Sequence, residues 1–144
     1  MKIGLSVAAV ALAVLVTGCA SVPMASVEAD TAAKVYKTEP GKANVYIYRN
    51  ENMGSAVKLP VLIDNMAVGD TVAKTYILKQ VEPGEHVITS KSEHDSKLSL
   101  SAAAGSNYFI WQEVKMGMWS AGSELHLVDE AKGKAGVAEC KLIE

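Results

Sequence analysis

From Asn44 onward the chain is a succession of short runs rich in β-branched and aromatic residues, each ended by a turn. The runs recur about every ten residues, a spacing typical of all-β domains. A βαβ crossover needs about a dozen or more residues between its strands, which these gaps do not provide. The spacing therefore indicates an all-β fold, either an antiparallel sandwich or a small barrel. Of these we expect an antiparallel β-sandwich of six or seven short strands with short flanking helices.

The expected strands are 44–49, 57–64, 75–81, 85–90, 96–102, 107–115 and 123–128. Asp64-Asn65 predicts a turn, and Pro60 predicts an edge or bulged strand because proline has no N–H for a ladder. Pro83-Gly84 predicts a tight hairpin. Residues 129–139 suggest a short helix weakened by Gly133 and Gly136.

The first residues form a separate apolar segment. Lys2 supplies a positive start, and Ile3–Val16 is apolar apart from Gly4 and Ser6. This run of about 14 residues is shorter than the roughly 20 that a transmembrane helix needs. A signal-peptide helix fits it better than a permanent span.

The segment ends in Val16-Thr17-Gly18-Cys19, an order that resembles the lipobox of bacterial lipoprotein precursors. The resemblance implies that the chain is cut between Gly18 and Cys19 and that the Cys19 thiol carries a diacylglycerol. The alternatives are an ordinary secretory signal cut near Gly18 and an uncleaved anchor. Ala20 follows the cysteine; in the enterobacterial sorting scheme, alanine there implies export to the outer membrane, where the chain faces the periplasm.

These features divide the chain into a removed signal peptide (1–18), a lipidated cysteine and tether with a short helix (19–43), and a β-sandwich domain (44–144). Loss of Lys2 with the signal leaves 13 basic and 16 acidic residues, a net charge of −3. This balance argues against nucleic acid as a partner and against a basic membrane-binding patch. Membrane attachment is therefore expected to depend on the covalent lipid at Cys19, with no other cofactor.

Within 19–43, Ser26 is placed to cap a helix whose small face is Ala29, Ala32, Ala33 and Tyr36, ended by Pro40-Gly41. At the other end of the chain, Cys140 has no partner once Cys19 is lipidated. It is either a redox or intermolecular thiol, or a small buried apolar residue.

Three segments resemble the family of bacterial lipoproteins known as domain of unknown function 2846. They are Gly41-Lys42-Ala43-Asn44-Val45-Tyr46-Ile47-Tyr48-Arg49, Glu82-Pro83-Gly84-Glu85-His86 and Ala104-Gly105-Ser106-Asn107-Tyr108-Phe109. The resemblance covers roughly residues 41–130 and implies a β-sandwich of the transthyretin-like or PEGA-like kind. It implies no catalytic residues.

The sequence lacks the nucleophile-elbow, zincin, phosphate-loop and Cys-x-x-Cys signatures, and we predict neither a catalytic residue nor a metal site. His86, His94 and His126 do not have zinc-site spacing, although neighbouring strands offer a way to bring His86 and His126 together. Glu113 follows Trp111 on a strand face. It is an acid with a raised pKa, a partner in a cross-strand ion pair, or a residue that is simply exposed.

The segment Met116-Gly117-Met118-Trp119-Ser120-Ala121-Gly122 is unusually apolar for a connection between strands. Either these residues fold back over an open end of the sandwich, or they form a partner-binding surface. Arg49 with Tyr46 and Tyr48 offers a cation–π surface or ordinary strand packing.

We therefore expect a non-enzymatic, lipid-anchored interaction or structural module that contacts an envelope protein through Met116, Met118 and Trp119, with Trp111 nearby. The alternative is a small-molecule or inhibitor-type binding lipoprotein with an apolar pocket lined by Trp111 and Trp119. An envelope hydrolase is a third, weaker hypothesis.

Overall fold

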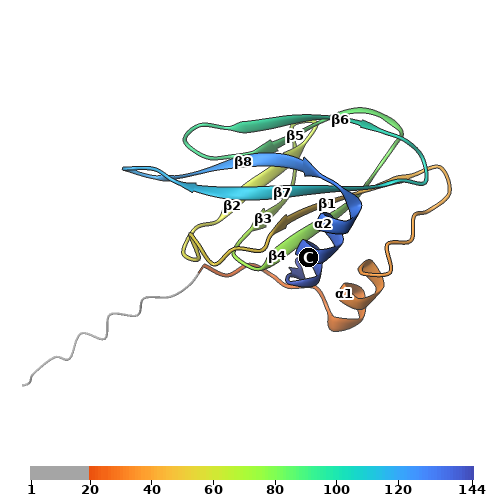
Figure 1. Cartoon of the computed structure of the whole chain (residues 1–144), viewed down its shortest axis with the longest axis horizontal. Coiled ribbons are helices and arrows are strands. Elements are labelled where there is room, and N and C mark those ends of the chain that lie inside the picture. The colour runs from red at the N-terminus through yellow and green to blue at the C-terminus, as the bar shows by residue number, and fades with distance from the viewer. Residues whose placement is uncertain (1–19) are drawn as a thin grey trace, which may run out of the picture.

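The computed structural model describes residues 20–144, which form two stacked β-sheets and two short helices (Figure 1). The expected signal segment, Gly18 and Cys19 lie outside the described residues. The helices are α1 (Val27–Ala33) and α2 (Glu130–Ala138). The strands are β1 (Ala43–Arg49), β2 (Leu59–Ile63), β3 (Met66–Thr71), β4 (Thr75–Val81), β5 (Gly84–Ser90), β6 (Ser96–Ala102), β7 (Asn107–Met116), β8 (Ala121–Val128) and β9 (Lys141–Leu142).

The larger sheet has the strand order β8-β7-β1-β4-β9, and the smaller one β3-β2-β5-β6. The prediction of a mostly β fold is confirmed. The prediction of purely antiparallel sheets is wrong, because β1 pairs in parallel with β7, and β4 pairs in parallel with β9. The predicted number of strands, six or seven, is also too small. Residues 20–144 form the seven expected strands and, in addition, β3 and β9.

The connection through Pro83 is not a hairpin. β4 belongs to the larger sheet and β5 to the smaller, so this turn carries the chain from one layer to the other. The Asp64-Asn65 turn is confirmed: both residues have positive φ, 51° and 66°, and join β2 to β3 as a two-residue hairpin. Pro60 lies on a central strand rather than an edge, but the expected bulge is present between Val61 and Leu62.

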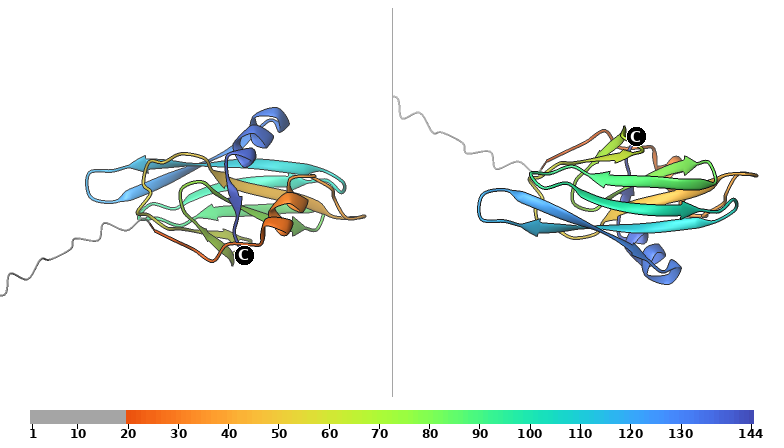
Figure 2. Two further views of the ribbon diagram at one scale, coloured as in Figure 1. Left: turned by 90° about the horizontal axis from the view of Figure 1, so that it is seen from below. Right: turned by 90° about the horizontal axis from the view of Figure 1, so that it is seen from above.

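The core lies between the two sheets and follows from strand alternation. Val45, Ile47 and Ile110 of the larger sheet face Val61 and Ile88 of the smaller one, all fully buried. The opposite face of the larger sheet is also covered, by α1, α2 and the chain between α1 and β1 (Figure 2). Its alternating residues are aromatic. The buried members of this second cluster include Tyr46, Tyr48, Tyr76 and Phe109.

The glycines of α2 allow it to lie close to the larger sheet. A Cβ at Gly133 would lie 2.1 Å from Phe109 Cγ, and one at Gly136 would lie 2.2 Å from Tyr48 Cε2. These glycines weaken the isolated helix, as the sequence indicates, but the close packing on the aromatic face requires them. Asp129 caps the helix by accepting a hydrogen bond from the Lys132 amide.

Residues 20–35 lie along the domain rather than forming a free tether. Ala25 N donates to Leu142 O, and Met24 pairs with Ile143. Ser26 caps α1 as expected, but Ala29 and Ala32 are exposed, and Ala33 is the alanine that packs inward. The helix ends before Tyr36, whose φ of 61° is left-handed, and not at Pro40-Gly41. No helix in the described part of the chain is long and apolar enough to cross a membrane.

Candidate interaction site at the β7–β8 hairpin

The β7–β8 hairpin projects from one end of the molecule and carries the apolar segment singled out in the sequence (Figure 1). Met116 pairs with Ala121, and four residues, 117–120, connect them. Gly117 N donates to Ser120 O at 3.0 Å, which closes the loop. A Cβ at Gly117 would lie 2.7 Å from that same oxygen, so the tight closure requires glycine there.

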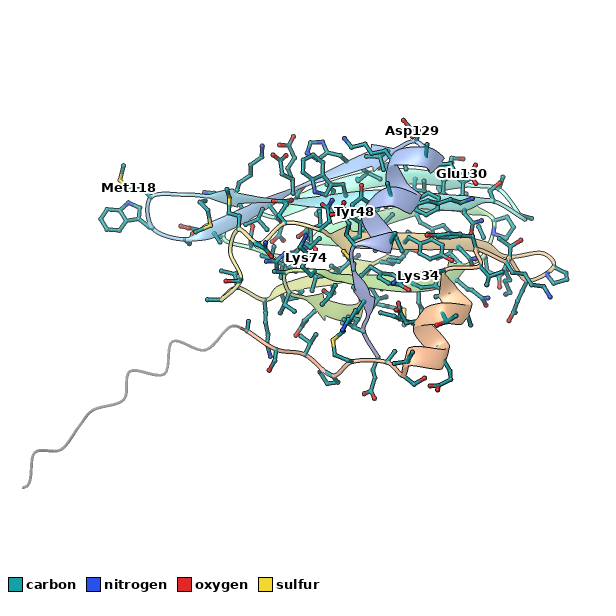
Figure 3. All side chains as sticks on the ribbon, turned by 60° about the horizontal axis from the view of Figure 1, so that its bottom comes forward. Lys34, Tyr48, Lys74, Met118, Asp129 and Glu130 are labelled. Atoms are coloured by element: carbon teal, nitrogen blue, oxygen red, sulfur yellow. The ribbon has the colours of Figure 1, made fainter. Side chains whose placement is uncertain are left out.

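Met118 and Trp119 point away from the body of the protein. Their side chains are 88% and 92% exposed, and Figure 3 shows Met118 at the outermost point of the hairpin. The fold-back alternative is therefore wrong, because residues that cover a core would be shielded. Met116 is also exposed, at 58%. The exposure of these large apolar side chains makes the hairpin loop a candidate contact surface.

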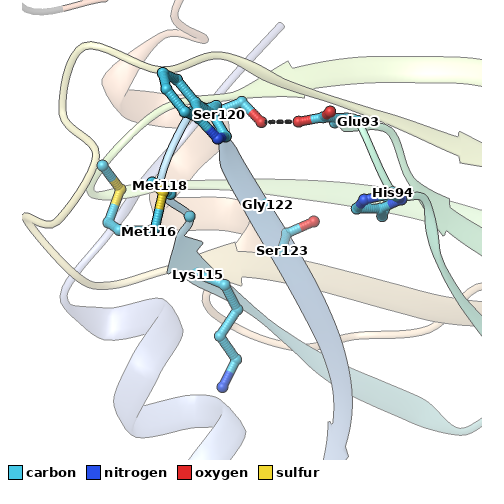
Figure 4. Close-up of a pocket in the computed structure, with 10 residues that line it drawn as sticks. Glu93, His94, Lys115, Met116, Met118, Ser120, Gly122 and Ser123 are labelled. Atoms are coloured by element: carbon cyan, nitrogen blue, oxygen red, sulfur yellow. Dashed lines mark hydrogen bonds between the residues drawn. The ribbon is translucent and has the colours of Figure 1, made fainter.

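A hollow of about 430 Å³ lies beside the hairpin loop (Figure 4). Its walls are the loop itself and the β5–β6 connection, which contributes Glu93 and His94. Ser120 Oγ donates to Glu93 Oε2 and ties the two loops together. The residues that line this hollow include Trp119 but not Trp111, so the predicted pocket shared by both tryptophans is not formed here.

The β1–β2 loop, residues 50–58, lies next to the hairpin and is organised by Arg49. The Arg49 side chain is fully buried, and its guanidinium donates to the carbonyl oxygens of Val57, Thr71 and Gly54 at 2.8, 3.1 and 2.9 Å. Burial lowers the pKa of Arg49. Arg49 faces inward, whereas Tyr46 contacts α1 and Tyr48 contacts α2 on the opposite face of β1. Of the two alternatives, these residues therefore show ordinary strand packing and not a cation–π surface.

The 50–58 loop also holds the beginning of the described chain. Ala20 N donates to Ser55 O at 3.0 Å. Gly54 of the same loop faces the hairpin, since a Cβ built on it would lie 3.8 Å from Met116 Sδ. Met53, 54% exposed, precedes it. We call Met53, Met116, Met118 and Trp119 the tip patch.

Trp111 lies on β7, away from the tip patch. Met116 lies five positions further along the strand, a distance of about 17 Å. Its ring stacks on His126 with centroids 5.0 Å apart, and the Lys132 ammonium lies 5.0 Å from its centroid. Its Nε1 donates to Glu51 at 2.8 Å. Trp111 thus packs between β8, α2 and the 50–58 loop.

Glu113 forms the cross-strand ion pair rather than a high-pKa acid. Hydrogen bonds from Lys115 and His126, at 2.9 and 2.7 Å, lower the pKa of Glu113. Glu113, Glu124 and His126 each offer a ligand atom, and these atoms lie within 4.8 Å of one another. The Lys115 ammonium already contacts both carboxylates, so the cluster is an ion-pair network with its own cation.

The other candidate reactive groups lie apart from this cluster. His86 is on β5, where its Nδ1 contacts Asp64 at 2.6 Å, and His94 is in the β5–β6 connection; neither meets His126. Cys140 is buried, and burial raises the pKa of its thiol to about 12. A thiol held protonated in this way is a small core residue rather than a nucleophile, which favours the second of the two interpretations of Cys140.

Comparison with known families matches residues 39–123 to the protein family of unknown function DUF2846. This match covers more than half of the chain. The chain belongs to the DUF2846 family. An uncharacterized protein of Haemophilus influenzae is 36% identical over 135 residues, 92% of this chain and 80% of that protein. No solved structure matches the chain significantly.

The DUF2846 match begins before β1 and ends within β8, so it includes the hairpin loop and leaves α1 and α2 outside. The arginine that ends the first strand of the recognised motif has a structural role here, since Arg49 holds the 50–58 loop. Sequence reasoning missed this role because a lone arginine at a strand end is usually exposed. The alternation of the strand did indicate that Arg49 is buried, because it places Arg49 on the same face as Val45 and Ile47.

Proposed function

We propose that this DUF2846 protein is a lipid-anchored envelope protein, attached through Cys19 and facing the periplasm from the outer membrane. Its domain acts by contact with other envelope components rather than by catalysis, as an interaction or structural module. The two sheets, packed face to face, support a β-sandwich of the transthyretin-like or PEGA-like kind.

The sequence Val16-Thr17-Gly18-Cys19 supports the anchor, and Ala20 supports the outer membrane. One acyl chain binds a membrane reversibly, whereas the three chains of such lipoproteins hold effectively permanently. The observation that carries the interaction role is the exposure of Met118 and Trp119 on a hairpin loop that is closed by the Gly117–Ser120 bond and tied to the β5–β6 connection by Ser120 and Glu93. A loop whose backbone is already held in place loses little backbone entropy on contact.

The test uses the full chain in its host. Wild-type protein should incorporate labelled palmitate and sediment with outer membranes, whereas Cys19→Ser should incorporate none. Ala20→Asp should move the protein to the inner membrane. A photo-crosslinking residue at position 118 should trap envelope components, and the same residue at Met66, another exposed methionine, should trap few. Palmitate-free wild type, or equal trapping at both positions, would refute the proposal.

A second candidate function is small-molecule or inhibitor-type binding. The hollow beside Trp119, about 430 Å³, favours it because ligand sites commonly measure about 300–1,000 Å³. The measurement is Trp119 fluorescence in the presence of a low-molecular-weight envelope extract. A saturable shift with that fraction supports this candidate, and an unchanged spectrum argues against it.

A further inference from the structure

The tip patch lies at the same end of the molecule as the start of the described chain. β1 and β7 run in parallel toward this end, which brings the 50–58 loop and the hairpin loop together. Ala20 is bonded to the first of these loops through Ser55. Figures 1 and 2 show the beginning of the described chain and the hairpin end on the same side of the body.

This arrangement fixes where a lipid on Cys19 would lie. Cys19 precedes Ala20 by one peptide bond, and consecutive Cα atoms are about 3.8 Å apart. No spacer stands between the two residues, so the lipid cannot be carried far from the 50–58 loop. A bilayer that holds the lipid is therefore brought to the end of the domain that carries Met53, Met118 and Trp119.

The charges at this end are balanced. The loops there carry three lysines and three carboxylates: Lys58, Lys74, Lys91, Glu51, Glu93 and Asp95. Such a surface neither repels an anionic bilayer nor depends on attraction to it. Tryptophan is enriched at membrane interfaces, where its apolar ring and its N–H group are both accommodated.

We propose that the tip patch inserts into the headgroup region of the bilayer that holds the lipid on Cys19, and so fixes the orientation of the domain on the membrane. This inference rests on the proposed function, because it needs the anchor. It identifies the contact of Met118 and Trp119 as lipid rather than protein. The hairpin is suited to this role because the Gly117–Ser120 bond and the Ser120–Glu93 contact hold the loop from which Met118 and Trp119 project.

The experiment uses full-length lipidated protein, purified in detergent and reconstituted into vesicles of phosphatidylethanolamine and phosphatidylglycerol. Some vesicles contain acyl chains brominated near the headgroup, which quench tryptophan on contact. The matched variant is Trp119→Phe, in which Trp111 alone emits. Wild type should lose most of its Trp119 emission in brominated vesicles, and Trp119→Phe should lose little, equally at low and high salt.

Position is controlled with two exposed methionines at opposite ends of the domain. Met118 is on the hairpin, whereas Met66 follows the β2–β3 turn at the other end. In the Trp119→Phe background, Met118→Trp should restore quenching by brominated lipid and Met66→Trp should not. Both sites are exposed, so neither substitution should prevent folding.

Three results would overturn the proposal. If the protein floats with the vesicles but Trp119 is insensitive to bromine, the anchor holds and the tip patch does not touch lipid. If Trp119 is shielded in native membranes but not in protein-free vesicles, its contact is a protein. If the protein does not float with vesicles at all, the proposed function itself fails, and this inference fails with it.

Discussion

Gly133 of α2 lies so close to Phe109 of β7 that a Cβ added to the glycine would lie 2.1 Å from the Phe109 Cγ atom. This contact explains why a helix that covers the larger sheet contains residues that weaken helices. It also means that intrinsic helix propensity and packing predict opposite effects of Gly133→Ala on stability.

Gly133→Ala should destabilise the protein. Helix propensity alone would stabilise α2 by about 1 kcal/mol. Overpacking against the ring costs about 1–3 kcal/mol and more where the neighbour cannot move. Because Phe109 is buried and stacked on Tyr46, we expect a net loss of about 2 kcal/mol in urea unfolding. Gly122→Ala is the control, since its Cβ would meet its nearest neighbour at 3.8 Å. Equal stability of the two variants would contradict this packing.

Arg49→Met should release the 50–58 loop. The substitution leaves the carbonyl oxygens of Gly54, Val57 and Thr71 without their donor, at a cost of about 2–3 kcal/mol in unfolding free energy. Limited proteolysis should then cut the loop faster than in wild type. Lys79→Met, at an exposed position, should change stability by less than about 0.5 kcal/mol. A protease-resistant loop in Arg49→Met would show that the guanidinium does not organise it.

Asp30→Asn should remove a pH-dependent part of the stability. Burial works to raise the pKa of Asp30, but hydrogen bonds from Tyr76, Lys34 and the Leu142 amide outweigh it and lower the pKa below 3.8. A carboxyl group whose pKa is lower in the folded state than in the unfolded state stabilises the protein at pH values above its unfolded pKa. This contribution is lost as the pH falls through the folded pKa.

The difference in unfolding free energy between wild type and Asp30→Asn should therefore be about 1–2 kcal/mol at pH 7 and shrink as the pH falls below about 4. Urea unfolding at several pH values measures it, with exposed Asp70→Asn as the control. A difference that grows on acidification would show that the pKa of Asp30 is not lowered in the folded protein.

Cys140 should be inert in the native protein. The residue is 2% exposed, and burial raises the pKa of its thiol to about 12. A thiol reagent should label Cys140 only after denaturation. Lipidated protein should then yield one reactive thiol per chain, since a thioether at Cys19 does not react. Rapid labelling of native protein, or a disulfide-linked dimer on a non-reducing gel, would restore the redox interpretation of Cys140.

Local pattern predicted the strands well because alternation of apolar residues is a property of neighbouring positions. The runs 44–49 and 75–81 and the Asp64-Asn65 turn are examples. The parallel pairing of β1 with β7 was not predictable in this way, because all four strands of the smaller sheet lie between these two strands in the sequence. For the same reason Pro83-Gly84 indicated a turn but not that the turn changes sheets.

The tip patch was recognisable in the sequence as an apolar connection, but its exposure was not. Hydrophobicity alone gives the same signal for a loop that folds back over a core and for one that projects into solvent. Its position beside Ala20 depends on the 50–58 loop, and that loop depends on a buried arginine that looks like a surface residue. Both the exposure of the tip patch and its position beside Ala20 therefore depend on tertiary contacts, which local sequence patterns do not reveal.

The proposed anchoring and the proposed membrane contact both depend on the lipid at Cys19, and intact mass spectrometry of the protein purified from its host membranes detects that lipid. The expected product is a chain that begins at Cys19 and carries the mass of a diacylglycerol and an N-linked acyl chain. A chain with unmodified Cys19, or one that still begins at Met1, would contradict it.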